Sequence, residues 1–251
     1  MRITWVGHST VLLEADGARL LTDPLLRPRV GHLRRVGGPV PSIGPVDAVL
    51  FSHVHYDHLD VPSLRLVQTE RLIVPPGARR LLERRGFAGV VELGEGEAVS
   101  IDALRVRATH ADHRAQRLPF SPEMPALGYL VEGSQRVYFA GDTDIFEGMR
   151  ELAHALDAAL LPIDGWGPRL GPGHLDPQRA AEALQLLRPR LAVPIHWGTY
   201  RRLGLSRDSS TLREPAARFE RLAAELAPDV EVRLLAPGER LEVQSREEAR
   251  L

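Results

Sequence analysis

Polar residues that can bind metal ions follow the ends of several short apolar segments in this chain. They are His53, His110, Asp142, Asp164 and His196. Short apolar runs bounded by turn residues are typical of buried strands, and strand ends are rigid places from which side chains can converge. We therefore expect a sheet-based fold in which one edge of the sheets carries a site.

The order of the expected elements indicates that both halves contain several strands followed by alternating helix and strand. One hairpin is expected to turn at Asp16-Gly17 and another at Gly133-Ser134. The clearest helix begins after Asp176, an N-terminal capping residue followed by proline. Two packed sheets with helices outside fit this order, in a single domain that covers residues 1–251.

Composition excludes several kinds of chemistry and partner. The chain has no cysteine and all 32 of its basic residues are arginine, which excludes thiol nucleophiles, disulfides and lysine Schiff bases. The formal net charge of -1 gives no overall attraction to nucleic acid. The sequence contains no run of roughly 18 apolar residues, which a membrane-spanning helix would need. The opening MRITWVGHST lacks the apolar stretch of a signal peptide, so we expect a cytoplasmic protein. The sequence leaves open whether the chain forms a homo-oligomer.

The segment FSHVHYDHLD, residues 51–60, follows an apolar run and concentrates metal-binding side chains. These are His53, His55, Asp57 and His58. In an extended chain alternate residues share a face, so the first two histidines can bind one ion. If the chain turns after Tyr56, the other two side chains reach a neighbouring position. The segment therefore predicts two adjacent metal sites.

Two adjacent divalent ions lie about 3.5–4 Å apart and need an anion between them, as well as further ligands. Three segments offer such residues after apolar runs: RATHADHR with His110, YFAGDTD with Asp142, and VPIHWGTY with His196. A set of histidine and aspartate ligands suits Zn²⁺ first, with Mn²⁺ or Fe²⁺ as alternatives. We expect two divalent ions as cofactors, with zinc favoured.

These motifs together resemble the metallo-β-lactamase superfamily. The segments WVGHST, LLTDP, FAGDT, LPIDGWGPR, GPGHLDP and PIHWGTY narrow the resemblance to one branch, which contains the N-acyl-phosphatidylethanolamine phospholipase D-like enzymes and the ascorbate-6-phosphate lactonase-like proteins. The motifs extend from Trp5 to Tyr200. The resemblance implies an α/β fold: a four-layer αβ/βα sandwich of two mixed β-sheets with outer helices and a two-metal site at one edge.

The resemblance also implies a set of ligands. His53, His55 and His110 would hold the first metal, Asp57, His58 and His196 the second, and Asp142 would bridge them. The family branch usually has Trp or Phe and then Ser after its third histidine, whereas Ala111 and Asp112 follow His110 here. His113 is therefore a rival third ligand, and we expect His110.

Two adjacent ions lower the pKa of a shared water molecule, which predicts hydrolysis by a metal-bridging hydroxide that Asp57 orients. The favoured reaction is that of a phosphodiesterase, similar to phospholipase D, on a small anionic phosphate ester. A lactonase acting on a cyclic ester and a non-catalytic metal-binding protein are the alternatives. Nucleic acid is not expected as a partner because the chain is not basic overall.

Three further residues are candidates for the site. His8 in WVGHST either belongs to the core or acts on the site from behind the ligands. Asp23 in TDP either fixes the tautomer of a ligand histidine or caps a turn. His174, in a loop rich in Gly and Pro, either shapes that loop or binds substrate and donates a proton to the leaving group.

The segment LRPRVGHLRRVGGP, residues 26–39, is a basic stretch without acidic residues. Its Pro and Gly content, shared by the whole range 24–45, predicts an exposed loop. One interpretation is a solvated charge run. The other, which we expect, is that the loop folds over the site entrance and that Arg34 and Arg35 clamp an anionic group of the substrate.

Overall fold

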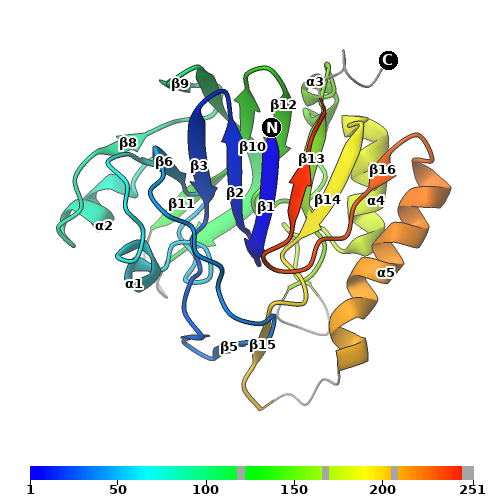
Figure 1. The fold of residues 1–251 in the computed structure, drawn as a ribbon, viewed down its shortest axis with the longest axis horizontal. Coiled ribbons are helices and arrows are strands. Elements are labelled where there is room, and N and C mark those ends of the chain that lie inside the picture. The colour runs from blue at the N-terminus through cyan, green and yellow to red at the C-terminus, as the bar shows by residue number, and fades with distance from the viewer. Residues whose placement is uncertain (118–121, 166–169, 205–208, 245–251) are drawn as a thin grey trace.

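The computed structural model describes residues 1–117, 122–165, 170–204 and 209–244. Two large sheets pack face to face, and helices cover their outer faces on opposite flanks of the molecule (Figure 1). Helices α1 (Val61–Leu64) and α2 (Arg79–Glu83) pack on the first sheet. Helices α3 (Met149–Leu152), α4 (Pro177–Leu187) and α5 (Ser209–Leu226) pack on the second. This arrangement confirms the predicted αβ/βα sandwich.

The first sheet is mixed and has the strand order β17-β1-β2-β3-β6-β7-β8. Neighbouring strands are antiparallel from β17 to β3 and parallel from β3 to β8. The hairpin between β2 and β3 turns at Asp16 and Gly17 as predicted, and both residues have positive φ, which suits a tight hairpin turn. The strands are β1 (Arg2–Gly7), β2 (Thr10–Ala15), β3 (Ala18–Thr22), β6 (Ala48–Leu50), β7 (Leu72–Val74), β8 (Val90–Glu92) and β17 (Arg240–Glu242).

The second sheet is also mixed and has the order β16-β14-β13-β12-β11-β10-β9. Its strands are antiparallel from β9 to β12 and parallel from β12 to β16. The strands are β9 (Ala98–Ile101), β10 (Leu104–Gln116), β11 (Glu123–Glu132), β12 (Arg136–Phe139), β13 (Ala158–Pro162), β14 (Leu191–Ile195) and β16 (Glu231–Val232).

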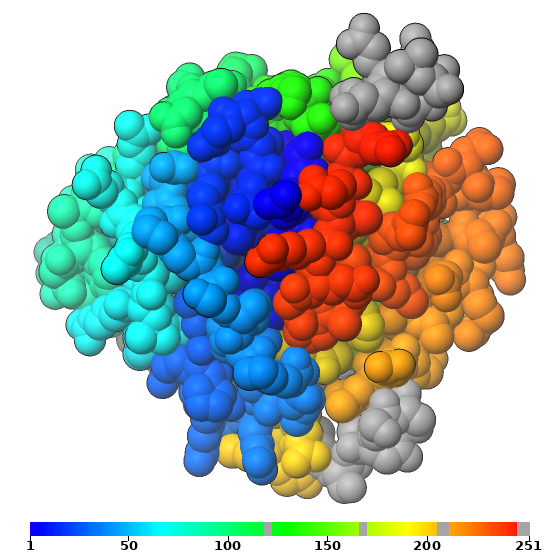
Figure 2. Space-filling model, viewed as in Figure 1, coloured from blue at the N-terminus to red at the C-terminus, as the bar shows by residue number. Residues whose placement is uncertain are grey.

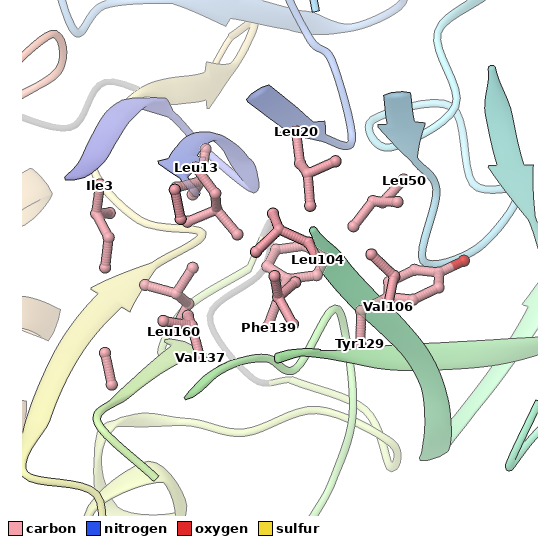
Figure 3. Packing of buried hydrophobic residues seen from close by; sticks show 14 of the residues in the cluster. Ile3, Leu13, Leu20, Leu50, Leu104, Val106, Tyr129, Val137, Phe139 and Leu160 are labelled. Carbon is pink, nitrogen blue, oxygen red and sulfur yellow. The ribbon is translucent and has the colours of Figure 1, made fainter. Parts of the chain in front are cut away.

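The main core lies between the two sheets. Leu13 and Leu20 of the first sheet face Val106, Tyr129 and Phe139 of the second, and all five are fully buried (Figure 3). Burying side chains of this size stabilises a fold by about 1.5–3 kcal/mol each. The core therefore fixes the two sheets against each other, and with them the edge at which their strands end.

Both ends of the described chain belong to the first sheet. Strand β17 pairs with β1, with Arg2 opposite Glu242, so the C-terminal segment lies beside the N-terminal strand (Figure 2). Within the described ranges, no helix is long and apolar enough to cross a membrane.

A third, small sheet lies below the ends of β1 and β14 in the view of Figure 1. It joins β4 (Arg29–Val30), β5 (Leu33–Arg35) and β15 (Tyr200–Arg202) in antiparallel pairs. Its apolar side chains form a separate cluster of Leu25, Val30, Leu33 and Tyr200. The expectation of an exposed loop over 24–45 is therefore wrong for 29–35, because this stretch pairs with a strand far away in the sequence.

Candidate metal centre

Histidine and aspartate side chains gather where strands of both sheets end. Strand β6 leads into the segment 53–58, and β10 carries His113. Asp142 follows β12, and His196 follows β14 directly. Strands β6, β13 and β14 are buried along their whole lengths, so the positions just beyond them are held rigidly.

The first group of side chains consists of His53, His55 and His113, whose ring nitrogens lie close enough to share one ion. The Nδ1 atom of His55 lies 2.9 Å from Nε2 of His53 and 3.2 Å from Nε2 of His113. Three converging imidazole nitrogens are a common ligand set for zinc.

His110 does not join this group, which corrects the expected ligand set. Its side chain is 47% exposed and its Nδ1 lies 3.0 Å from a carboxylate oxygen of Glu95. Buried positions of β10 are even-numbered up to Ala108 and odd-numbered from Thr109 on, and the pairing with β11 shifts register between His110 and Arg114. Within this irregular stretch His110 lies outward, whereas His113, which is 8% exposed, lies in the centre.

One signal in the sequence could have identified His113. In LRVRATHADHRAQ the apolar residues Leu104, Val106 and Ala108 alternate on even positions, whereas Ala111 and Ala115 continue on odd ones. His113 shares the parity of the last two alanines. A change of phase within one strand predicts a bulge.

The second group consists of Asp57, His58, His196 and His8. Around the Oδ2 atom of Asp57, Nε2 of His8 lies at 3.3 Å, and Nε2 of His58 and of His196 both lie at 3.7 Å. Asp57, His58 and His196 were the expected ligands of one ion. His8 was expected behind the ligands, whereas its ring nitrogen lies among them.

Asp142 lies between the two groups. Its carboxylate oxygens are 3.3 Å from Nε2 of His58, 3.5 Å from Nε2 of His196 and 4.0 Å from Nε2 of His53. Its carboxylate is therefore within about 4 Å of ring nitrogens from both groups.

Hydrogen bonds on the far side of each ring decide which nitrogen faces the centre. His113 Nδ1 lies 2.8 Å from the carbonyl oxygen of Gly173, and His196 Nδ1 lies 2.7 Å from that of Asp164. A carbonyl oxygen only accepts, so Nδ1 carries the hydrogen and Nε2 presents a lone pair. Both rings are therefore in the tautomer that binds a metal through Nε2.

Asp23 fixes the rings of His53 and His58 in the same way. Its carboxylate, which is fully buried, accepts hydrogen bonds from the Ser52 backbone N–H at 2.8 Å and from the Ser52 hydroxyl at 2.5 Å. His58 Nδ1 donates to it at 2.8 Å. Because the Ser52 hydroxyl hydrogen is engaged, Ser52 Oγ accepts from His53 Nδ1 at 2.9 Å. The structure thus places Asp23 where it sets tautomers.

The donor set fits divalent cations. In the tautomers set by these hydrogen bonds, the lone pairs of His58 and His196 face carboxylates, which is repulsive unless a positive charge lies between them. Among the described residues, the buried atoms His58 Nε2 and Asp142 Oδ1 have no hydrogen-bond partner. Ions held between imidazole nitrogens and carboxylate oxygens would satisfy these atoms, and this chemistry favours zinc.

The pKa values of the centre show the same need for positive charge. Burial lowers the pKa of His58, but Asp142, Asp57 and Asp23 outweigh it and raise this pKa well above the usual value. Burial raises the pKa of the Asp142 carboxyl, but His196, His58 and His53 hold it well below its usual range. In the metal-free protein, a proton on His58 therefore balances part of the carboxylate charge.

His8 remains neutral beside these charges. Burial, with His196 nearby, lowers its pKa to about 3 although Asp57 acts in the opposite direction. Its backbone carbonyl accepts hydrogen bonds from the Trp5 indole N–H at 2.8 Å and from the His196 backbone N–H at 3.0 Å. His8 therefore joins the first strand of the chain to the end of β14.

Three residues of the centre have left-handed backbone conformations that only glycine adopts freely. The φ angles are 55° at His8, 33° at Asp23 and 61° at His196. Each such residue costs of the order of 1–3 kcal/mol and persists where the surrounding structure imposes it. Strain at these three positions supports their role in a functional site.

His174 lies at the rim of the centre. Its Nε2 is 3.9 Å from an oxygen of Asp142, and its side chain is 29% exposed. It also belongs to a group of possible ligand atoms with His113 and Asp142. The side chain is therefore partly accessible from the surface, and its role in binding substrate stays a prediction. The neighbouring residues 166–169 of the LPIDGWGPR motif lie outside the described residues.

A cavity of about 550 Å³ adjoins the centre, with His55 and Asp57 in its wall. The small sheet forms another part of the wall through Val30, Gly31, His32 and Leu33. The basic segment therefore reaches the site entrance, as expected. The remaining lining residues are Arg27, Tyr56, Asp60, Pro62 and Arg117.

The expected clamp by Arg34 and Arg35 is wrong. The Arg35 guanidinium turns inward, where it donates to the Val6 carbonyl at 2.7 Å and to the Gly38 carbonyl at 2.8 Å. Arg34 is exposed and stands next to Leu33, which faces the cavity. Because successive side chains of a strand point to opposite faces, Arg34 points away from the cavity.

Arg117 lies at the site although the sequence did not indicate it. Its guanidinium lies over the Tyr56 ring at 4.0 Å, and Nη1 donates to the carbonyl oxygens of Val54 at 2.8 Å and Leu59 at 2.5 Å. The Val54 carbonyl lies near the start of the segment 53–58 and the Leu59 carbonyl directly follows it, so Arg117 ties the start of this segment to its end. No local pattern in the sequence indicates this contact.

Comparisons with known proteins agree with this geometry. The model of the Beta-lactamase superfamily domain matches residues 18–197, a range that includes both groups of side chains except His8. A UPF0173 metal-dependent hydrolase of Opitutus terrae is 34% identical over 250 residues, which cover 97% of this chain and 100% of the relative.

Two further relatives differ in how they resemble the chain. N-acyl-phosphatidylethanolamine-hydrolyzing phospholipase D 1 of Caenorhabditis elegans is 30% identical over 226 residues, which cover 78% of this chain and 64% of the relative. The structure of Igni18, a metallo hydrolase from Ignicoccus hospitalis, has a TM-score of 0.70 at 23% identity and covers 97% of this chain and 99% of its own. This last likeness concerns the fold alone.

The assignment of His113 rather than His110 as a metal ligand can be tested with a matched pair of variants. His113→Ala should lose at least one of the ions bound by the wild-type protein, because it removes one of three ligands of one site. His110→Ala should keep the wild-type metal content. Elemental analysis after gentle purification measures both. Loss of metal from the His110 variant alone would contradict the assignment.

Metal affinity should fall as the pH is lowered. The raised pKa of His58 means that its proton stabilises the metal-free fold fully below about pH 6.5, and that this stabilisation is lost as the pH rises through the raised pKa. An ion requires the neutral ring, so protons compete with it. Chelator competition should show Zn²⁺ affinity about tenfold lower at pH 6 than at pH 7. An affinity independent of pH over this interval would argue against His58 as a ligand.

Proposed function

The chain belongs to the metallo-β-lactamase superfamily and is a metal-dependent hydrolase of that fold, and from this premise we propose that it acts with two metal ions and cleaves a phosphodiester bond in a small phosphate ester. The observation that carries this proposal is the position of Asp142 between two groups of ligand atoms. A bridging carboxylate is what two adjacent divalent ions require.

Seven side chains would hold the two ions. His53, His55 and His113 would bind the first, Asp57, His58 and His196 the second, and Asp142 both. Bound ions of this kind lower the pKa of a water molecule and polarise the bond to be cleaved. Asp23 and the carbonyls of Gly173 and Asp164 would keep the imidazole nitrogens aimed at the ions.

Two residues would act on the reacting atoms. Asp57 is held as a carboxylate by its histidine neighbours, because His58, His196 and His8 outweigh the effect of burial and lower its pKa. It can accept a hydrogen bond from the attacking water and orient it. His174, at the open rim, can hold a substrate oxygen or protonate the leaving group.

A lactonase is the second candidate, and one observation favours it. The two arginines of the cavity wall both have protein partners: Arg27 binds Asp60, and Arg117 binds the Val54 and Leu59 carbonyls. A neutral cyclic ester fits such a wall, because it needs no cation beyond the metal ions themselves. The same ligands and the same attacking water would serve this reaction.

The test of the function is a parallel assay of metal-loaded protein. We expect turnover of bis-p-nitrophenyl phosphate, and we expect Asp142→Ala to lose at least one ion and at least about a hundredfold in kcat/KM. Turnover of a simple lactone without turnover of the phosphodiester would reject the phosphodiesterase in favour of the lactonase. Turnover of neither compound by protein with two bound ions would reject both.

The role of His174 needs a variant that keeps the metals. His174→Gln should lower kcat by about a hundredfold at unchanged metal content, because it removes a proton donor and not a ligand. His154→Gln is the matched control, because His154 is exposed in the turn after α3. If both variants keep a rate within a few-fold of wild type, His174 has no part in the reaction.

A further inference from the structure

We propose that the cavity beside the metal centre binds an apolar group of the substrate, so that the substrate is an amphiphile whose polar, cleavable group lies at the ions and whose hydrocarbon part lies in the cavity. This inference rests on the proposed hydrolytic function and names the substrate class for it. It replaces the anionic clamp that the sequence predicted.

The cavity and the centre share a wall. His55 and Asp57 line the cavity, and both belong to the groups of ligand atoms. A group that fills the cavity is therefore in contact with the side chains around the ions. The volume, about 550 Å³, lies within the range of pockets that bind small molecules.

Apolar side chains make up much of the rest of the wall. Val30 and Leu33 come from the small sheet, Pro62 from the first turn of α1, and Tyr56 from the ligand-bearing segment. Tyr56 is 51% exposed although it is a large aromatic residue, and Pro62 is exposed as well. Apolar surface left open beside a reactive centre is typical of a surface that a ligand covers.

The charged residues of the wall are already engaged by the protein. Arg27 forms a bidentate pair with Asp60, with distances of 2.7 and 2.8 Å. Arg117 lies over the Tyr56 ring and donates to two backbone carbonyls. An anionic group in the cavity would have to compete with these partners, whereas a hydrocarbon group would not.

The small sheet turns part of its positive charge away from the cavity. Arg34 of β5 stands in register with Arg29 of β4 and Arg201 of β15. Residues in register on neighbouring strands share a face, so these three arginines lie on the face opposite Leu33. Arg35 and Arg202 lie on the same face as Leu33, but neither is among the residues that line the cavity, and Arg35 already donates to the Val6 and Gly38 carbonyls.

Binding of n-alkylphosphonates to the metal-loaded protein tests this inference. The phosphonate stands in for the polar group at the ions, and the alkyl chain probes the cavity. Titration calorimetry with methyl-, butyl- and octylphosphonate should show an affinity that rises about tenfold or more from methyl to butyl, because each buried CH₂ contributes to binding. The measured quantity is the slope of affinity against chain length.

Two variants with the same added charge locate the effect. Pro62→Glu places a carboxylate in the cavity wall and should flatten the slope to less than about threefold from methyl to butyl, at unchanged metal content. Leu66→Glu should keep the wild-type slope, because Leu66 is 65% exposed and lies outside this cavity wall. Any repulsion of the phosphonate by the new charge lowers all three affinities alike and leaves the slope unaffected.

A second variant guards against a folding effect of the first. Tyr56→Ser changes an exposed side chain and should also reduce the slope. Equal affinities for the three phosphonates in the wild type, or no binding of any of them, would overturn the inference. The function is judged separately by turnover of bis-p-nitrophenyl phosphate and of the lactone. Turnover without a chain-length effect would therefore reject the apolar site and leave the hydrolase intact.

Discussion

The carboxylates of Asp57 and Asp142 face the ring nitrogens of His58 and His196 across 3.3–3.7 Å in a buried place, and the rest of the centre depends on this opposition. Lone pairs and carboxylates repel each other, and burial removes the water that would screen them. Only a cation relieves this repulsion, whether it is a proton on His58 or a metal ion. The raised pKa of His58 and the lowered pKa of Asp142 follow from the same cause. The fold thus holds its ligands in a geometry that is unfavourable without positive charge.

The sandwich makes this geometry rigid because five of the seven candidate ligands follow β6 or β14, which are buried along their whole lengths. Backbone carbonyls and Asp23 then set the rotation and tautomer of the rings. The energetic cost is visible in the backbone of His8, Asp23 and His196, which adopt left-handed conformations. Stability from the core between the sheets offsets that cost. The positions of the side chains at the strand ends therefore depend on the packing of the core between the two sheets.

Sequence reasoning predicted the sandwich and the segment 53–58, because both follow from local patterns: short apolar runs and a dense spacing of ligands. It failed where contacts between distant segments decide the outcome. In β10, whose pairing shifts register between His110 and Arg114, His113 rather than His110 lies in the centre. Pairing of β5 with β15 turns Arg35 toward Val6 and buries Leu33. Arg117 reaches back to Val54 and Leu59 across about sixty positions of sequence. The change of phase in LRVRATHADHRAQ is a local trace of the first case, whereas the other two contacts leave little trace in the residues near them.

The hydrogen bond from the His196 backbone to the His8 carbonyl has a consequence for how the chain is made. One partner lies in the turn after β1 and the other follows β14, so the whole of residues 9–195 must be made before the two can meet. Until then the histidines of 53–58 lack the strand ends that aim them. A metal centre that uses both groups therefore cannot form before His196 has left the ribosome, and a chain that stops before His196 has no finished centre in which to retain a metal.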